Sequence, residues 1–126
     1  MVFALVHSPL VGPGTWSPVA RELERLGHGA VVPSLLGSGK IPPRHWRRCV
    51  EAAREAMRTG AEPIVLVGHS GGGLLLPSIA DAVAPPVSGL IFVDSGLPET
   101  NGETPTAVPA FLDHLRSLAV DGTLPP

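Results

Sequence analysis

The chain has a single cysteine, no tyrosine and an aromatic content of only 4%. Because Cys49 has no second cysteine to pair with, it cannot form a disulfide within the chain, which suits a reducing compartment. No uninterrupted apolar run approaches the length that a membrane-spanning helix needs. The first residues show neither a basic segment nor a small-residue cleavage site, as a secretion signal would. We therefore expect a cytoplasmic protein that does not bind a membrane.

Charge is also sparse. Charged residues make up 16% of the sequence, the formal net charge is −2, and Lys40 is the one lysine. Nucleic-acid-binding domains normally present a basic surface, so we expect no nucleic acid as partner. No spacing of histidine, cysteine and acidic residues matches a metal site. We expect no metal and no cofactor, and a small molecule as the substrate.

Apolar residues are abundant, at 44% of the 126 residues. Continuous apolar runs occupy residues 2–7, 30–33, 64–68 and 90–94. Continuous rather than alternating runs predict strands buried on both faces, as in a parallel sheet. Segments with helical spacing separate the runs, so the order of elements predicts a doubly wound α/β fold with a mostly parallel sheet.

The first expected helix has Ser17 as N-cap and Pro18 at its first position. The second covers about residues 45–58, and the third runs from the glycine cluster after residue 70 to about Val83. The spacing predicts these core-facing residues in the first two helices: Val19, Leu23, Leu26, Trp46, Val50, Ala53 and Met57.

The sequence changes character after Ser95. Residues 97–109 contain three prolines, two glutamates and a glycine, and residues 110–119 read as an amphipathic helix. We divide the chain into a core over residues 1–96 and a connection with the start of a cap-like helical region over residues 97–126. An α/β chain that ends soon after its fourth strand would have an incomplete sheet. Its open edge and apolar faces predict a homo-oligomer.

The junction after the third apolar run reads Gly68-His69-Ser70-Gly71-Gly72, which fits G-x-S-x-G between a strand and a helix. So sharp a reversal predicts strained dihedrals at Ser70, at a cost of about 1–3 kcal/mol. We expect the glycines at 68 and 72 because Cβ atoms there would collide with the serine. The turn would expose the Ser70 hydroxyl and aim the Gly71 N–H where an oxyanion forms. A tight turn with serine as a simple N-cap is the alternative.

Residues 3–39, 64–80 and 89–105 resemble an α/β-hydrolase-fold enzyme of the esterase and hydroxynitrile-lyase-like branch. In that resemblance they correspond to the oxyanion loop with its flanking elements, to the nucleophile elbow, and to the strand that leads into the cap. The resemblance thus implies an α/β-hydrolase fold whose later strands and most of whose cap are absent from these 126 residues. The resemblance implies that Ser70 is the nucleophile and that the Gly71 N–H is one oxyanion donor.

The loop after the first strand would supply the second donor. The family usually has His-Gly there, whereas this chain has His7-Ser8, and Pro9 has no N–H. The candidates are the Leu10 N–H, the Ser8 N–H and the Ser8 hydroxyl. In lyase-like members a hydroxyl at the position of Ser8 takes part in catalysis. The alternative is a loop serine that bonds its own backbone.

A nucleophilic serine also needs a base and a group that orients the base. The family's base follows the last strand of the sheet, and none of the five histidines matches it. His114 on the final helix is the candidate within the chain. Asp94 at a strand end is the candidate acid, and a hydrogen-bonded strand-end aspartate is its alternative. His69 is expected to point away from Ser70 and to line or support the pocket.

Three functions stay open at this point. The first is a serine hydrolase that acts on a small ester, amide or lactone through an acylated Ser70. The second is a lyase in which Ser70 transfers a proton, and the third is a non-catalytic binding or assembly module. Without its base a triad enzyme loses about 10⁴–10⁶ in turnover. If these 126 residues are the whole protein, efficient hydrolysis therefore requires that His114 or a partner chain completes the site.

Overall fold

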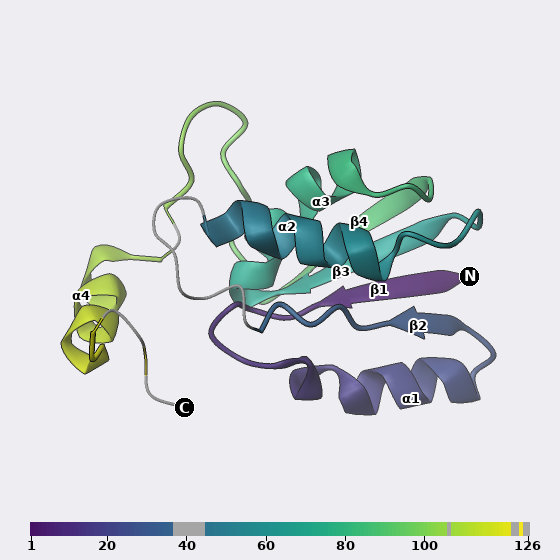
Figure 1. Ribbon diagram of the computed structural model, residues 1–126, viewed down its shortest axis with the longest axis horizontal. Coiled ribbons are helices and arrows are strands. Elements are labelled where there is room, and N and C mark those ends of the chain that lie inside the picture. The colour runs from purple at the N-terminus through teal and green to yellow at the C-terminus, as the bar shows by residue number, and fades with distance from the viewer. Residues whose placement is uncertain (37–44, 106, 122–123, 125–126) are drawn as a thin grey trace.

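A sheet of four parallel strands forms the centre of the molecule (Figure 1). The computed structural model describes residues 1–36, 45–105, 107–121 and 124. The strands are β1 (Val2–Val6), β2 (Gly29–Val31), β3 (Ile64–His69) and β4 (Val87–Val93), and they lie in the order β2-β1-β3-β4. The parallel pairing confirms the predicted α/β class.

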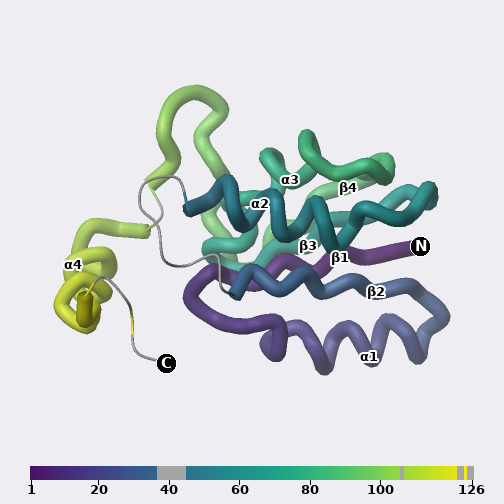
Figure 2. The backbone as a smooth tube through the Cα atoms, viewed as in Figure 1, coloured from purple at the N-terminus to yellow at the C-terminus, as the bar shows by residue number. Residues whose placement is uncertain are grey.

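Helices cover both faces of the sheet. α1 (Ser17–Arg25), preceded by the 3₁₀ turn η1 (Pro13–Thr15), packs on one face, and α2 (His45–Ala56) and α3 (Leu76–Ala82) pack on the other. α4 (Pro109–Leu118) lies apart from these layers, beyond the carboxyl ends of the strands, as the backbone trace in Figure 2 shows. No helix in the described part of the chain is long and apolar enough to cross a membrane.

Two apolar cores explain why the central strands are apolar throughout. Alternate residues of a strand point to opposite faces, so Ala4 and Val6 pack toward α2 and α3 while Leu5 packs toward α1. The larger core includes Cys49, which is fully buried. Burial on both faces is thereby confirmed for β1 and β3.

The edge strand β4 departs from the prediction. Leu90, Ile91 and Val93 are 37%, 45% and 37% exposed, although the continuous apolar run predicted burial on both faces. The physical reason is that β4 pairs with β3 alone in the described residues, so nothing there covers its outer side.

Several helix predictions also need correction. α1 includes Ser17 as its first residue, and Trp16 rather than Ser17 is the N-cap. The buried stripe starts at Trp16 and continues through Ala20, whereas Val19 and Leu26 are exposed. In α2, Trp46 is 45% exposed, because it lies in the first turn, where the core ends. The third helix begins as a 3₁₀ segment, η2 (Ser70–Leu75), and becomes α-helical only at α3.

Candidate active site

Ser70 occupies a strained turn at the carboxyl end of β3. Its φ is 51°, in the left-handed region that residues with a Cβ rarely adopt. Such a conformation costs about 1–3 kcal/mol and persists only where the surrounding structure enforces it. The strain predicted for this position is therefore present, and a relaxed N-cap turn does not describe it.

Two glycines allow the turn, for a different reason from the one predicted. A Cβ on Gly68 would lie 2.6 Å from the Cα of Gly73, and a Cβ on Gly72 would lie 2.6 Å from the carbonyl oxygen of Val6. The nearest collisions are thus with other backbone segments and not with Ser70, as had been expected. The glycines let η2 lie directly against the carboxyl ends of β3 and β1.

His7 holds the loop after β1 in place. The side chain is fully buried, and its Nε2 accepts a hydrogen bond of 3.0 Å from the Leu35 N–H. Because Nε2 is the acceptor, the ring proton lies on Nδ1, which donates to the carbonyl oxygen of Ser8 at 2.8 Å. Both ring nitrogens are used in this way, so His7 is a structural clamp between the loop and the chain that follows β2.

Ser8 lies beside Gly71. The serine is only 4% exposed, and its Oγ accepts a hydrogen bond of 3.3 Å from the Leu10 N–H. A Cβ on Gly71 would lie 3.3 Å from this Oγ and 3.5 Å from Cδ of Pro9, so the two loops are in contact. The Leu10 N–H is directed at Ser8, whereas the proton of the Ser8 hydroxyl is not used in that bond.

A cavity of about 690 Å³ opens over these residues, between the carboxyl ends of the strands and α4. Apolar side chains of α4, among them Phe111, Leu112 and Leu115, form part of its wall. Trp46, which was predicted to face the core, lines the cavity instead. Of the residues predicted for the site, the following line the cavity: Ser8, Pro9, Leu10, Ser70, Gly71 and Asp94.

Two predicted site residues lie elsewhere. The His69 ring packs edge-on against Trp16 with 6.2 Å between ring centroids, and its buried Nδ1 has no protein hydrogen-bond partner. His69 therefore points away from Ser70 as expected, but it does not line the cavity. His114 is exposed on α4 and is also outside the lining. Among the described residues, no histidine lines the cavity.

The end of β4 adds a contact that the sequence did not reveal. Asp94 has a φ of 44°, a second strained residue next to the cavity. The following residue, Ser95, donates a hydrogen bond from its Oγ to the carbonyl oxygen of Ser70 at 2.7 Å. No local sequence signal predicts a contact between residues 25 positions apart.

Comparison with known proteins places this geometry in a family. The sequence profile of the alpha/beta hydrolase family matches residues 3–126. The chain is 28% identical over 122 residues to a carbendazim hydrolyzing esterase of Nocardioides sp. (strain SG-4G). This match covers 87% of this chain and 48% of that protein. It is 33% identical over 106 residues to methylesterase 2 of Arabidopsis thaliana. This match covers 78% of this chain and 40% of that protein.

A solved structure agrees with this result. An extracellular alpha/beta-hydrolase from a Paenibacillus species superposes with a TM-score of 0.69 at 21% identity, over 94% of this chain and 50% of that chain. The chain thus spans 40% to 50% of the length of these three proteins. The profile match covers nearly all of the sequence and the fold agrees with it, so the chain belongs to the alpha/beta hydrolase family.

Proposed function

We propose that the chain carries the nucleophile and the oxyanion hole of an esterase-type serine hydrolase for a small ester, amide or lactone. The positive φ of Ser70 is the observation that carries the proposal, because it holds a hydroxyl-bearing residue in a strained turn at the wall of a cavity. A strained serine between a strand and a helix is the form that a nucleophile elbow takes. The esterase names of the matched relatives support the same reaction class.

In this proposal the Ser70 hydroxyl gives its proton to a base and attacks the substrate's carbonyl carbon. The tetrahedral adduct then breaks its bond to the alcohol or amine, which leaves with that proton, and the acyl group stays on Ser70 as an ester. The oxyanion accepts hydrogen bonds from the Gly71 N–H and from the Ser8 hydroxyl. We choose the hydroxyl rather than the Leu10 N–H because that N–H already donates to Ser8 Oγ. One such donor is worth about 10²–10³ in rate. Water then hydrolyses the acyl-enzyme and restores Ser70.

The proton of Ser70 has to pass to a base, and the described lining contains no imidazole. We place this base outside the described lining. It is either His114, carried inward by a movement of α4, or a histidine from another segment or copy of the protein. Asp94 lines the cavity and is our candidate for the carboxylate that orients the base.

A binding module without catalysis is the second candidate, and the same lack of a histidine in the described lining favours it. A lyase that uses Ser70 only for proton transfer would form no covalent adduct. Incubation with p-nitrophenyl acetate followed by intact-protein mass spectrometry, together with an assay of cyanohydrin cleavage, separates the three functions.

We expect an acetyl adduct on the native chain and on the Ser34→Ala control, whose hydroxyl lies on an exposed loop, but none on Ser70→Ala. Cleavage of a cyanohydrin without any serine adduct would favour the lyase. A folded chain with neither adduct nor turnover would favour the binding module.

A further inference from the structure

The charged side chains that line the cavity share one sign. Asp94 at the end of β4 and Glu99 in the connection that follows it are the charged residues of the described lining. The remaining lining residues are apolar or small and uncharged. No lysine or arginine of the described lining balances the two carboxylates, and Lys40 and Arg44 of the sequence fall outside the described residues.

The backbone fixes where both carboxylates lie. Asp94 directly follows Val93, which pairs with His69 in the sheet, so it stands beside the strand that carries Ser70. Glu99 belongs to a loop that is closed by a hydrogen bond of 2.9 Å from its N–H to Oγ1 of Thr104. Thr104 lines the cavity as well. The negative charge is therefore built into the wall on the side of β4.

Asp94 and Glu99 are both exposed at the cavity wall, so water and salt screen their charges and a ligand experiences them at short range. At that range the two carboxylates repel an anionic head group and attract a cationic one. The apolar side chains Trp46, Phe111, Leu112 and Leu115 meanwhile favour a ligand with a hydrocarbon body.

We propose that this cavity selects ligands with an apolar body and a neutral or cationic head group, and that Asp94 and Glu99 exclude those with a carboxylate. The selection among ligands does not depend on the proposed function, since binding needs no turnover. Only its extension to substrates rests on that function. The substrates that fit the cavity would be neutral or amine-bearing esters. Half-esters of dicarboxylic acids, which carry a free carboxylate, would be rejected.

Binding of octylammonium, octanol and octanoate tests the proposal, because the three probes share one chain and differ in head group. Trp46 lines the cavity, so its fluorescence reports occupancy. We expect octylammonium to bind most tightly and octanoate most weakly at low salt. The difference in Kd between them should be about tenfold, since an exposed carboxylate attracts one probe and repels the other. The Ser70→Ala chain should give the same order, which separates this result from any failure of the hydrolase proposal.

The double variant Asp94→Asn, Glu99→Gln should reduce the difference to about twofold, since the charges are removed. Asparagine tolerates a positive φ, so the variant keeps the turn at position 94. Glu103→Gln is the matched control: it removes a charge from the same connection at a residue outside the lining, and should leave the difference unchanged.

Three results would overturn the proposal. One is equally tight binding of octanoate and octylammonium to the native chain. Another is an undiminished difference in the folded double variant, and the third is a folded chain that binds none of the probes.

Discussion

The Ser95 hydroxyl donates a hydrogen bond to the carbonyl oxygen of Ser70 across 2.7 Å. Ser95 follows β4 and Ser70 follows β3, so the bond joins the ends of two neighbouring strands at the strained residue. The same hydroxyl lies 2.9 Å from the carbonyl oxygen of Gly96. Ser95 is therefore placed to fix the orientation of the peptide that follows Ser70, and with it the aim of the Gly71 N–H.

Ser95→Ala should slow the reaction of Ser70 with a fluorophosphonate by about tenfold or more, because a misaligned oxyanion donor stabilises the transition state less. Ser88→Ala is a matched control. Ser88 Oγ donates to the Ile64 carbonyl oxygen at 3.0 Å, near the other end of the same two strands. Each variant should lose about 1 kcal/mol of stability, but only Ser95→Ala should lose reactivity. Equal labelling rates for both variants would refute the positioning role.

Gly72→Ala should destabilise the chain by about 1–3 kcal/mol, the usual cost of forcing extra atoms into a packed site. The new Cβ would lie 2.6 Å and 2.7 Å from the carbonyl oxygens of Val6, the last residue of β1, and of His7, whose ring is held by two hydrogen bonds. In Gly14→Ala nothing lies within 4 Å of the new Cβ, so this variant should unfold near the native urea midpoint. A Gly72→Ala midpoint equal to that of Gly14→Ala would contradict this packing.

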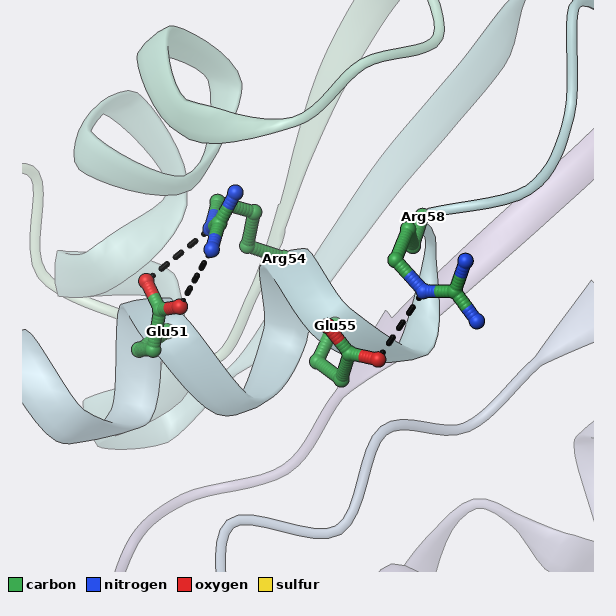
Figure 3. Close-up of polar contacts among 4 residues, drawn as sticks. All are labelled: Glu51, Arg54, Glu55 and Arg58. Atoms are coloured by element: carbon green, nitrogen blue, oxygen red, sulfur yellow. Dashed lines mark hydrogen bonds and ion pairs between the residues drawn. The ribbon is translucent and has the colours of Figure 1, made fainter.

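Ion pairs on the surface of α2 predict how the stability of the fold depends on pH (Figure 3). Arg54 donates two hydrogen bonds to Glu51, and Arg58 donates one to Glu55. The hydrogen bonds from Arg54 lower the pKa of Glu51. A lowered pKa means that the pair stabilises the fold above the ordinary carboxyl pKa, and that this contribution is lost as pH falls through the lowered value.

Glu51→Gln should therefore be slightly less stable than the native chain at neutral pH and equally stable in strong acid. The difference should be small and should shrink further in salt, since both side chains are exposed to solvent. Urea midpoints measured across the acid range, with and without salt, check this. A difference that grows as the pH falls would have the wrong sign.

We propose from the exposed apolar residues of β4 that the chain self-associates, because a strand edge that is unpaired among the described residues can pair with another chain. We expect the chain to sediment as a dimer or larger species at micromolar concentration. Ile91→Lys, at a residue that is 45% exposed, should shift the distribution toward monomer without unfolding the chain. A native chain that sediments only as monomer would argue against this association.

The parts of the fold that local residue types determine could be predicted from the sequence. Continuous apolar runs indicated the central strands, because a strand that is buried on both faces needs apolar residues at every position. The glycines around Ser70 indicated a sharp turn, because few other residues permit one. Alternation along β3 could also have placed His69 on the same face as Val65 and Val67, and hence outside the cavity.

Other features depend on distant parts of the chain and left no local signal. The exposure of Leu90 depends on what lies beside β4, and a hydrophobic run carries no information about that. Trp46 lies at the end of a helical stripe, where spacing alone cannot separate core from cavity wall. The contact of Ser95 with Ser70 and the wall contributed by α4 exist only once the strands have assembled.

Reactivity of the Ser70 hydroxyl decides between an active site and a merely strained turn. We would label the native chain, Ser70→Ala and Ser34→Ala with a fluorophosphonate, after confirming by circular dichroism that each is folded. We predict labelling of the native chain and of Ser34→Ala, and none of Ser70→Ala. Labelling that persists in Ser70→Ala, or a folded native chain that takes up no label, would contradict a nucleophile at this position.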